Sequence, residues 1–198
     1  ELSNTDGFDP DASQNVLIEN CFAYCSDDNV AIKTTGYSGY LGDAEEITVR
    51  GCVFLTRKSS LKVGTETRGT RMSKILFEDN DVVESDRGMA LYVSDGTALS
   101  DVRYRNNRFE RCHPDSKRMM FHFVVNARRK DSPIGSIRGV EVKDCSFLTP
   151  FPKAPEIKCP SKGDIEGVVF ENLTVSGHRI TAPEEVNAKI VNTEVIFK

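Results

Sequence analysis

Six segments of this 198-residue chain share one pattern, in which a short alternating run of apolar residues is followed by a polar turn. Alternation with a period of two indicates β-strands. The segments begin at residues 16, 47, 75, 102, 140 and 168, so their starts are 31, 28, 27, 38 and 28 residues apart. A repeat of this length predicts a solenoid, in which similar coils stack and bury a continuous core.

Each repeat also carries a second apolar strand and shows no helical stripe. The second strands are "NVAIKTT" at 29, "SLKVGTE" at 60, "MALYVSD" at 89 and "MFHFVVN" at 120. Strand, turn, strand and turn at this period predict an all-β fold, a right-handed parallel β-helix. We expect one domain over residues 1–198, with a Pro-rich excursion at 149–164. No amphipathic cap is visible at either end, so we also expect a fragment that lacks N-terminal coils.

The sixth place of the repeat predicts a ladder of side chains at one inward corner of the solenoid. This place holds Cys21, Cys52, Asn80, Asn107, Cys145 and Leu173. Three cysteines are therefore expected to be ladder residues. Disulfides among Cys25, Cys112 and Cys159 stay open, because connectivity is not readable from sequence. Asn172 matches a glycosylation acceptor, but its place at a corner favours a structural role.

The composition excludes several function classes. The net charge is −4 and the lysines and arginines are scattered, which argues against a nucleic-acid partner. No apolar run reaches 18 residues, so no membrane span is predicted. We expect no cofactor and no bound metal, and the pattern makes no prediction of the oligomeric state.

Three aspartates are the candidate catalytic residues. Asp6 lies in "NTDGFDP" at 4–10, and Asp27 and Asp28 lie in "SDDN" at 26–29. A separation of 21 residues is close to one compact coil, so Asp6 should stack beside the pair on an outward face. Carboxylates that close repel, and one should keep its proton. An acid beside a carboxylate base suits hydrolysis of a glycosidic bond. Ordinary turns and a calcium-binding corner remain alternatives.

The two motifs together resemble those of glycoside hydrolase family 28, the polygalacturonase family of pectin-lyase-like β-helices. The similarity covers roughly residues 3–110. It implies that Asp27 is the general acid, that Asp6 and Asp28 position and activate water, and that the anomeric carbon is inverted. It also implies a polysaccharide or oligosaccharide substrate and an extracellular or periplasmic location.

Two features of polygalacturonases are missing from this chain. The family's Gly-His-Gly motif falls near Lys58 and Ser59, where no histidine is present. The family's Arg-Ile-Lys motif, which holds the substrate carboxylate, falls on Ala90 and Tyr92. Plain polygalacturonate is therefore less expected, and a modified pectin or a neutral glycan, as in the related family 49, stays open.

Other side chains on the successive second strands are candidate substrate-binding residues. They are Lys33, Lys62, Glu66, Arg87 and Tyr92. A lysine could pair with a catalytic carboxylate or contact a sugar, and a tyrosine ring could stack on one. Solvated lysines and a tyrosine packed between coils are the simpler alternatives. His122 lies in an apolar strand, which favours a core position.

Two other function classes fit the same pattern. A non-catalytic β-helix that binds glycans or serves as a structural module would need no acid at Asp27. A calcium-dependent polysaccharide lyase would use acidic residues to hold the ion and Lys33 or Lys62 as the base.

Overall fold

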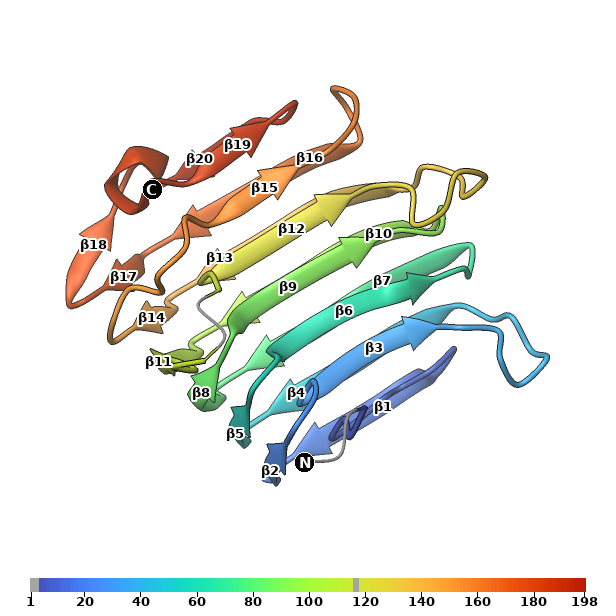
Figure 1. Ribbon diagram of the computed structural model, residues 1–198, viewed down its shortest axis with the longest axis horizontal. Helices are drawn as coiled ribbons and strands as arrows, with labels where there is room; N and C mark the ends of the chain where they lie inside the picture. The colour runs from blue at the N-terminus through green and yellow to red at the C-terminus, as the bar shows by residue number, and fades with distance from the viewer. Residues whose placement is uncertain (1–3, 116–117) are drawn as a thin grey trace.

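The structure, a computed structural model that describes residues 4–115 and 118–198, is a right-handed parallel β-helix of about six turns. The coils follow one another along a single axis, from the blue N-terminal strands to the red C-terminal ones (Figure 1). The predicted fold class is therefore confirmed.

Each coil contributes a strand to each of three sheets, where the repeat predicted at least two strands. Sheet one contains β1 (Gln14–Glu19), β4 (Ala44–Arg50), β7 (Arg71–Glu78), β10 (Ala98–Arg105), β13 (Ser136–Lys143), β16 (Ile165–Glu171) and β20 (Val195–Phe197). Sheet two contains β2 (Phe22–Cys25), β5 (Val53–Thr56), β8 (Asp81–Ser85), β11 (Arg108–Cys112), β14 (Ser146–Phe147), β17 (Leu173–Val175) and β18 (His178–Ile180). Sheet three contains β3 (Val30–Thr34), β6 (Ser59–Thr67), β9 (Arg87–Val93), β12 (Phe121–Val125), β15 (Glu156–Lys158) and β19 (Lys189–Val191).

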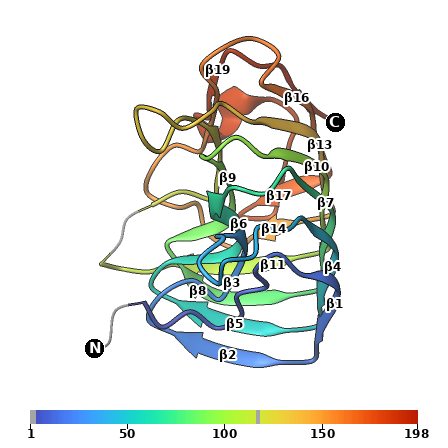
Figure 2. The same cartoon turned by 90° about the vertical axis from the view of Figure 1, so that its right-hand side faces the viewer.

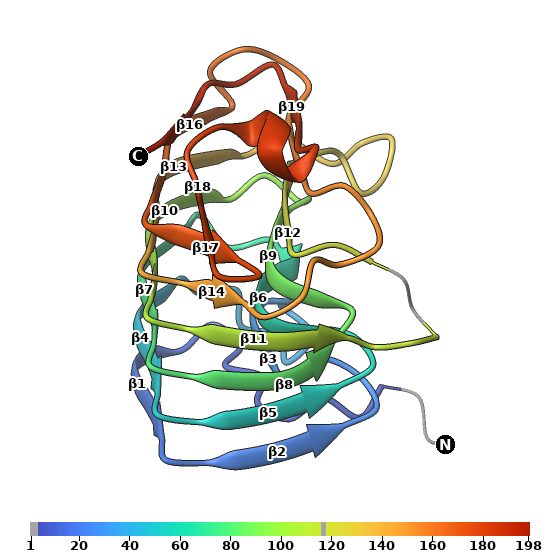
Figure 3. The same cartoon turned by 90° about the vertical axis from the view of Figure 1, so that its left-hand side faces the viewer.

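The strands pair in parallel and nearly in register, except at the C-terminal end of sheet two. Views from the two sides show the strands of sheets one and two stacked coil upon coil (Figures 2 and 3). At the C-terminal end of sheet two, β18 runs antiparallel to β17. A single 3-10 turn, η1 (Pro183–Val186), follows β18. No helix in the described residues is long and apolar enough to cross a membrane.

The corner between sheets one and two explains the polar fifth place of the repeat. The residues there adopt φ between 49° and 61°, a left-handed conformation that Asn, Asp and Gly tolerate best. They are Asn20, Gly51, Asp79, Asn106, Asp144 and Asn172. Asn172 also donates to Oδ1 of Asp144 at 2.8 Å, in agreement with a structural role for this residue.

The next residue of each corner points inward and forms the predicted ladder. The amide N–H of Cys52 donates to Oδ1 of Asn80 at 3.1 Å, and the N–H of Asn80 donates to Oδ1 of Asn107 at 3.1 Å. Nδ2 of Asn107 lies 3.9 Å from Sγ of Cys145. None of the six cysteines forms a disulfide among the described residues, so the open possibility of disulfides does not occur in this structure.

Inward residues of the three sheets fill the core with stacked rings. Phe77 and Tyr104 stack at 4.9 Å between ring centroids, and Phe109 and Phe147 stack at 4.4 Å. Each fully buried ring of this size contributes roughly 2–3 kcal/mol of hydrophobic free energy. Because like residues stack on like, the core fixes the register that aligns the outward side chains of sheet three.

The Pro-rich stretch 149–164 leaves the coil only in part. Its middle forms β15, which pairs with β12 and β19 in sheet three. The outward positions of sheet three therefore continue through this stretch, from the N-terminal coil to β19.

Candidate active site

The chain around Asp6 lies in parallel alongside β3 and places the first motif beside the second. The N–H of Gly7 donates to the carbonyl oxygen of Asp28 at 2.9 Å, and the N–H of Phe8 donates to that of Asn29 at 2.8 Å. A Cβ on residue 7 would lie 2.5 Å from the carbonyl oxygen of Asn29. The glycine of the Asn-Thr-Asp-Gly corner is therefore required by the close approach of the two coils.

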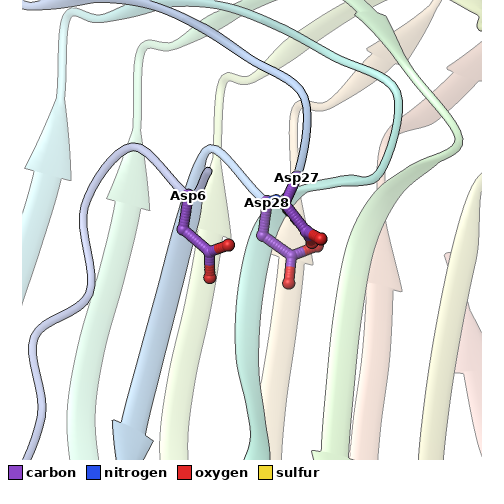
Figure 4. Close-up of side chains that lie close together, drawn as sticks. All are labelled: Asp6, Asp27 and Asp28. Atoms are coloured by element: carbon purple, nitrogen blue, oxygen red, sulfur yellow. Dashed lines mark hydrogen bonds between the residues drawn. The ribbon is translucent and has the colours of Figure 1, made fainter. Parts of the chain in front are cut away.

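The three aspartates meet as the sequence predicts. Each of Asp6, Asp27 and Asp28 presents a carboxylate oxygen, and these atoms all lie within 4.8 Å of one another. Asp27 and Asp28 come from the corner before β3, and Asp6 comes from the neighbouring coil (Figure 4). Such a cluster could also hold a divalent cation through oxygen ligands.

Lys33 neutralises the Asp6 side of the cluster. Its Nζ lies 2.8 Å from Oδ2 of Asp6 and 2.7 Å from Oδ2 of Asp9. Burial opposes the charge of Lys33, but its hydrogen bonds to Asp6 and Asp9 outweigh that effect and raise its pKa. Burial also raises the pKa of Asp9, although the bond from Lys33 acts against it. Lys33 is therefore a fixed cation that stabilises negative charge on Asp6.

Lys62 plays the matching part for Asp28. Nζ of Lys62 lies 2.5 Å from Oδ2 of Asp28, and the N–H of Ser59 donates to Oδ1 at 2.9 Å. Both side chains are nearly buried, at 11% exposure for Lys62 and 6% for Asp28. The carboxylate of Asp28 is thus held in one orientation by partners on the next coil.

Asp27 differs from its two neighbours. Its Oδ1 accepts the N–H of Asp28 at 3.0 Å, and its own N–H donates to the carbonyl oxygen of Thr5 at 3.4 Å. No ion pair to Asp27 occurs among the described residues. Of the three carboxyl groups, Asp27 is therefore the one to which no lysine is bound.

The three aspartates line a cleft of about 910 Å³. Asp6, Asp27, Asp28, Lys33, Lys62 and Glu66 all line it. The register of β3 and β6 shifts between Ile32 and Thr34, so β6 bulges around Gly64 and brings Thr65 and Glu66 to the cleft. Glu66 binds Arg128 at 2.6 Å, and this bond outweighs burial and lowers the pKa of Glu66.

Tyr92 and Arg87 do not line this cleft in the described residues. The Lys62 ammonium lies 5.8 Å from the centroid of the Tyr92 ring. Arg87 donates to both oxygens of the buried Asp86 at 2.8 and 3.0 Å. Burial raises the pKa of Asp86 to about 6, although the attraction of Arg87 opposes this.

His122 points outward, so the core position favoured from the sequence is wrong. Nδ1 of His122 lies 2.7 Å from the hydroxyl of Tyr92, and Nε2 lies 3.1 Å from Oε2 of Glu156. Burial lowers the pKa of His122 to about 4 despite the nearby Glu156. Lys158 binds the same glutamate at 2.8 Å. A neutral imidazole thus links the coils on either side of its own, on the outer face of sheet three.

Several residues at the cleft were missed by the sequence reasoning. Asp9, Asp11, Thr35 and Tyr37 also line it. Asp9 follows Asp6 by three residues in the same quoted motif, and this proximity could have signalled its role. Asn29, buried after the aspartate pair, donates to the carbonyl oxygens of Ala23 at 3.2 Å and Leu55 at 2.9 Å. It braces the corner that carries Asp27 and Asp28.

Comparisons with known proteins agree with this geometry. A search of curated proteins found no match. Among solved structures, the chain is similar to endopolygalacturonase I from Stereum purpureum complexed with two galacturonate, at a TM-score of 0.55 and 19% identity. That match covers 98% of this chain and 55% of the other, so the chain spans about half the length of that protein. At this identity the likeness shows the fold.

The sequence itself carries the family assignment. The model of glycosyl hydrolases family 28 matches residues 1–191, which is nearly the whole chain. The chain therefore belongs to glycosyl hydrolases family 28.

Proposed function

We propose that the cleft hydrolyses a glycosidic bond of a polysaccharide or oligosaccharide, with Asp27 as general acid and Asp6 and Asp28 as the base. The observation that carries this assignment is the distribution of the lysines. Lys33 and Lys62 stabilise negative charge on Asp6 and Asp28, at 2.8 and 2.5 Å. Asp27, without a bound lysine, is the carboxyl group best suited to carry the shared proton.

In the proposed reaction, Asp27 gives its proton to the glycosidic oxygen as the bond from that oxygen to the anomeric carbon breaks. A water held between Asp6 and Asp28 attacks the anomeric carbon from the opposite face. Its proton passes to one of these two carboxylates, and the product has the inverted configuration. The proton on Asp27 is restored from solvent after the products leave.

Inversion follows from the family resemblance and not from the carboxylate spacing. The oxygens of the trio lie within 4.8 Å of one another. Inverting pairs are usually about 6.5–9.5 Å apart, and retaining pairs about 5 Å apart. Two lysine-bound carboxylates side by side can nevertheless hold one water molecule between them. A retaining enzyme needs no such water in its first step, because a carboxylate attacks the sugar there. The stereochemistry of the product is therefore a sharp test.

The state of the two lysines favours hydrolysis over the lyase alternative. A lyase base must lose its proton near neutral pH, which requires a lowered pKa in a lysine. The pKa of Lys33 is raised by Asp6 and Asp9, and the ammonium of Lys62 is bound to Asp28. A lyase would also need calcium, so a chelator and the ultraviolet absorbance of an unsaturated product separate the two reactions.

Because a polysaccharide substrate lies outside the cytoplasm, we propose an extracellular or periplasmic location for the protein. Oxidising compartments favour disulfides, and the six cysteines form none among the described residues, so they give this location no added support.

The experiment is reducing-sugar release from a panel of polysaccharides by the wild-type chain and by Asp27→Asn. The panel contains polygalacturonate, rhamnogalacturonan, dextran, pullulan and galactan. Asp101→Asn is the matched control, because Asp101 is a half-buried aspartate of sheet one, outside the cleft, whose φ of 51° suits asparagine.

Release by the wild type and by Asp101→Asn, with loss in Asp27→Asn, supports the hydrolase. Release that survives in Asp27→Asn excludes this residue as the acid. Glycan binding without release by the folded wild type supports the non-catalytic alternative.

A further inference from the structure

We infer that the cleft accepts a neutral glycan in preference to a polyuronide, an inference that rests on the proposed function and names its substrate class. A polyuronide carries one carboxylate on each sugar, so a site for it needs cations that are free to pair with the substrate. Among the described residues that line this cleft, neither cation is free of a carboxylate partner.

The lining of the cleft is strongly acidic. Among the residues that the structure describes, six carboxyl groups and two ammonium groups line it. The carboxyl groups belong to Asp6, Asp9, Asp11, Asp27, Asp28 and Glu66. Even with Asp27 protonated, carboxylates outnumber cations. An incoming polyanion would meet a negative potential, whereas a neutral sugar would not.

Both cations of the cleft are already bound to carboxylates of the protein. Lys33 contacts Asp6 and Asp9, and Lys62 contacts Asp28. A substrate carboxylate could recruit either lysine only by displacing a partner. That exchange would leave a poorly hydrated aspartate without its cation, which is costly at positions as buried as Asp28.

The adjoining face of sheet three is balanced in the same way. Arg128 binds Glu66 at 2.6 Å, and Lys158 binds Glu156 at 2.8 Å. His122, on the neighbouring strand β12, is neutral at pH 7, because burial holds its pKa at about 4. The charged groups of these two ion pairs, beside the three aspartates, are therefore already bound to partners of opposite charge.

Two further cations act on Asp86 and do not line the cleft. Burial raises the pKa of Asp86, and the attraction of Lys58 and Arg118 acts against that effect. Neither side chain lines the cleft. Arg68 lies 5.3 Å from the centroid of the Tyr37 ring and donates to the carbonyl oxygen of Thr35 at 3.2 Å, also outside the lining.

The rim offers a contact that suits a neutral sugar. Tyr37 lines the cleft and is 70% exposed. An exposed ring of this kind can stack on the C–H face of a pyranose, and this contact needs no charge on the sugar. The hydroxyl groups of the sugar can donate to the many carboxylate oxygens of the lining, which act only as acceptors when ionised.

The test compares two polymers that differ only in charge. One is α-1,4-linked polygalacturonate, and the other is the same polymer after reduction of each carboxylate to a hydroxymethyl group. Binding of oligomers of both is measured by calorimetry on Asp27→Asn, and hydrolysis of both, with dextran and galactan added, is measured on the wild type. We expect a neutral oligomer to bind at least about tenfold more tightly than the anionic one.

A charge variant tests the cause. Glu66→Gln removes one lining carboxylate and the 2.6 Å ion pair of Arg128, which keeps a longer contact with Asp95 at 3.9 Å. It should therefore strengthen binding of the anionic oligomer by about tenfold and change neutral binding less. Glu141→Gln is the matched control, because it releases Arg105 on the outer face of sheet one. It should leave the binding of both oligomers unchanged.

The outcomes separate this inference from the proposed function. Equal or tighter binding and faster hydrolysis of polygalacturonate overturn the inference and keep the hydrolase. Neutral binding without hydrolysis overturns the hydrolase and keeps the preference for a neutral glycan. The absence of binding and hydrolysis with every neutral polymer overturns the inference.

Discussion

Nζ of Lys62 lies 2.5 Å from Oδ2 of Asp28, and both side chains are almost completely buried. Replacing Lys62 by Met keeps the length of the side chain but leaves Asp28 charged and unpaired. We expect the free energy of unfolding to fall by about 3–5 kcal/mol at pH 7, as for other broken buried pairs. Urea unfolding of both proteins measures the change.

Lys74→Met is the matched control for that substitution. Lys74 also binds a carboxylate across two coils, Oε1 of Glu46 at 2.6 Å, but on the exposed face of sheet one. Screening by water should make its loss hard to detect. An equal loss of unfolding free energy in the two variants would contradict the buried ion pair between Lys62 and Asp28.

Product stereochemistry is the second prediction. A reaction followed by proton NMR in its first minutes should show the anomer opposite to that of the cleaved bond, before mutarotation mixes the two. We expect inversion because, in the proposed reaction, Asp6 and Asp28 hold water and do not attack the sugar. The retained anomer as first product would assign one of these two carboxylates as a nucleophile, consistent with their spacing of at most 4.8 Å.

Gly7→Ala should reduce activity by moving Asp6. The new methyl group would lie 2.5 Å from the carbonyl oxygen of Asn29 and 3.0 Å from Sγ of Cys25, so the corner must shift away from Asp28. A shift of about 1 Å in a catalytic group can cost about 100-fold in rate. Steady-state kinetics should therefore show a fall in kcat.

A second glycine variant separates misplacement from lost stability. Gly139→Ala, on sheet one, imposes a φ of 67° on alanine, but its Cβ meets only an ordinary contact at 4.0 Å with the backbone nitrogen of Asp101. It should lower the unfolding temperature and leave kcat unchanged. Equal losses of kcat in both variants would mean that Gly7 acts only through stability.

The fold was predictable because its signal repeats. Alternation in six segments gave the strands, and the recurring corner gave the ladder from Cys52 through Asn80 to Asn107. The stacking of Asp6 beside Asp27 followed from the coil length alone. These features depend on local periodicity, which one sequence displays several times over.

The parts that failed depend on contacts between coils that no period encodes. His122 lies in an apolar strand, yet β12 places it outward between Tyr92 and Glu156. Register across three coils decides that position. The bulge at Gly64, which brings Glu66 to the cleft, likewise breaks the regular alternation. The third strand of each coil was too short to stand out as a separate run.

Asp86 should impose an unusual pH dependence on stability. Burial raises its pKa to about 6 in the folded protein, against 3.8 as the ordinary value. Between these two pH values the folded state binds more protons than the unfolded state. The contribution of Asp86 to the free energy of unfolding is therefore complete below about pH 4. It is lost as the pH rises through 6, by about 3 kcal/mol in total.

Asp86→Asn isolates this contribution, because asparagine cannot titrate. Relative to the variant, the wild type should lose about 3 kcal/mol of unfolding free energy between pH 4 and pH 7, measured by urea titration at each pH. Glu171→Gln should behave in the opposite sense, because Lys143 and Lys198 lower the pKa of Glu171 to about 2. The stability that Glu171 adds is present above about pH 4.5 and is lost as the pH falls toward 2. A wild-type to Asp86→Asn difference that stays constant from pH 4 to pH 7 would show that Arg87 keeps Asp86 ionised throughout, as their contacts at 2.8 and 3.0 Å would then require.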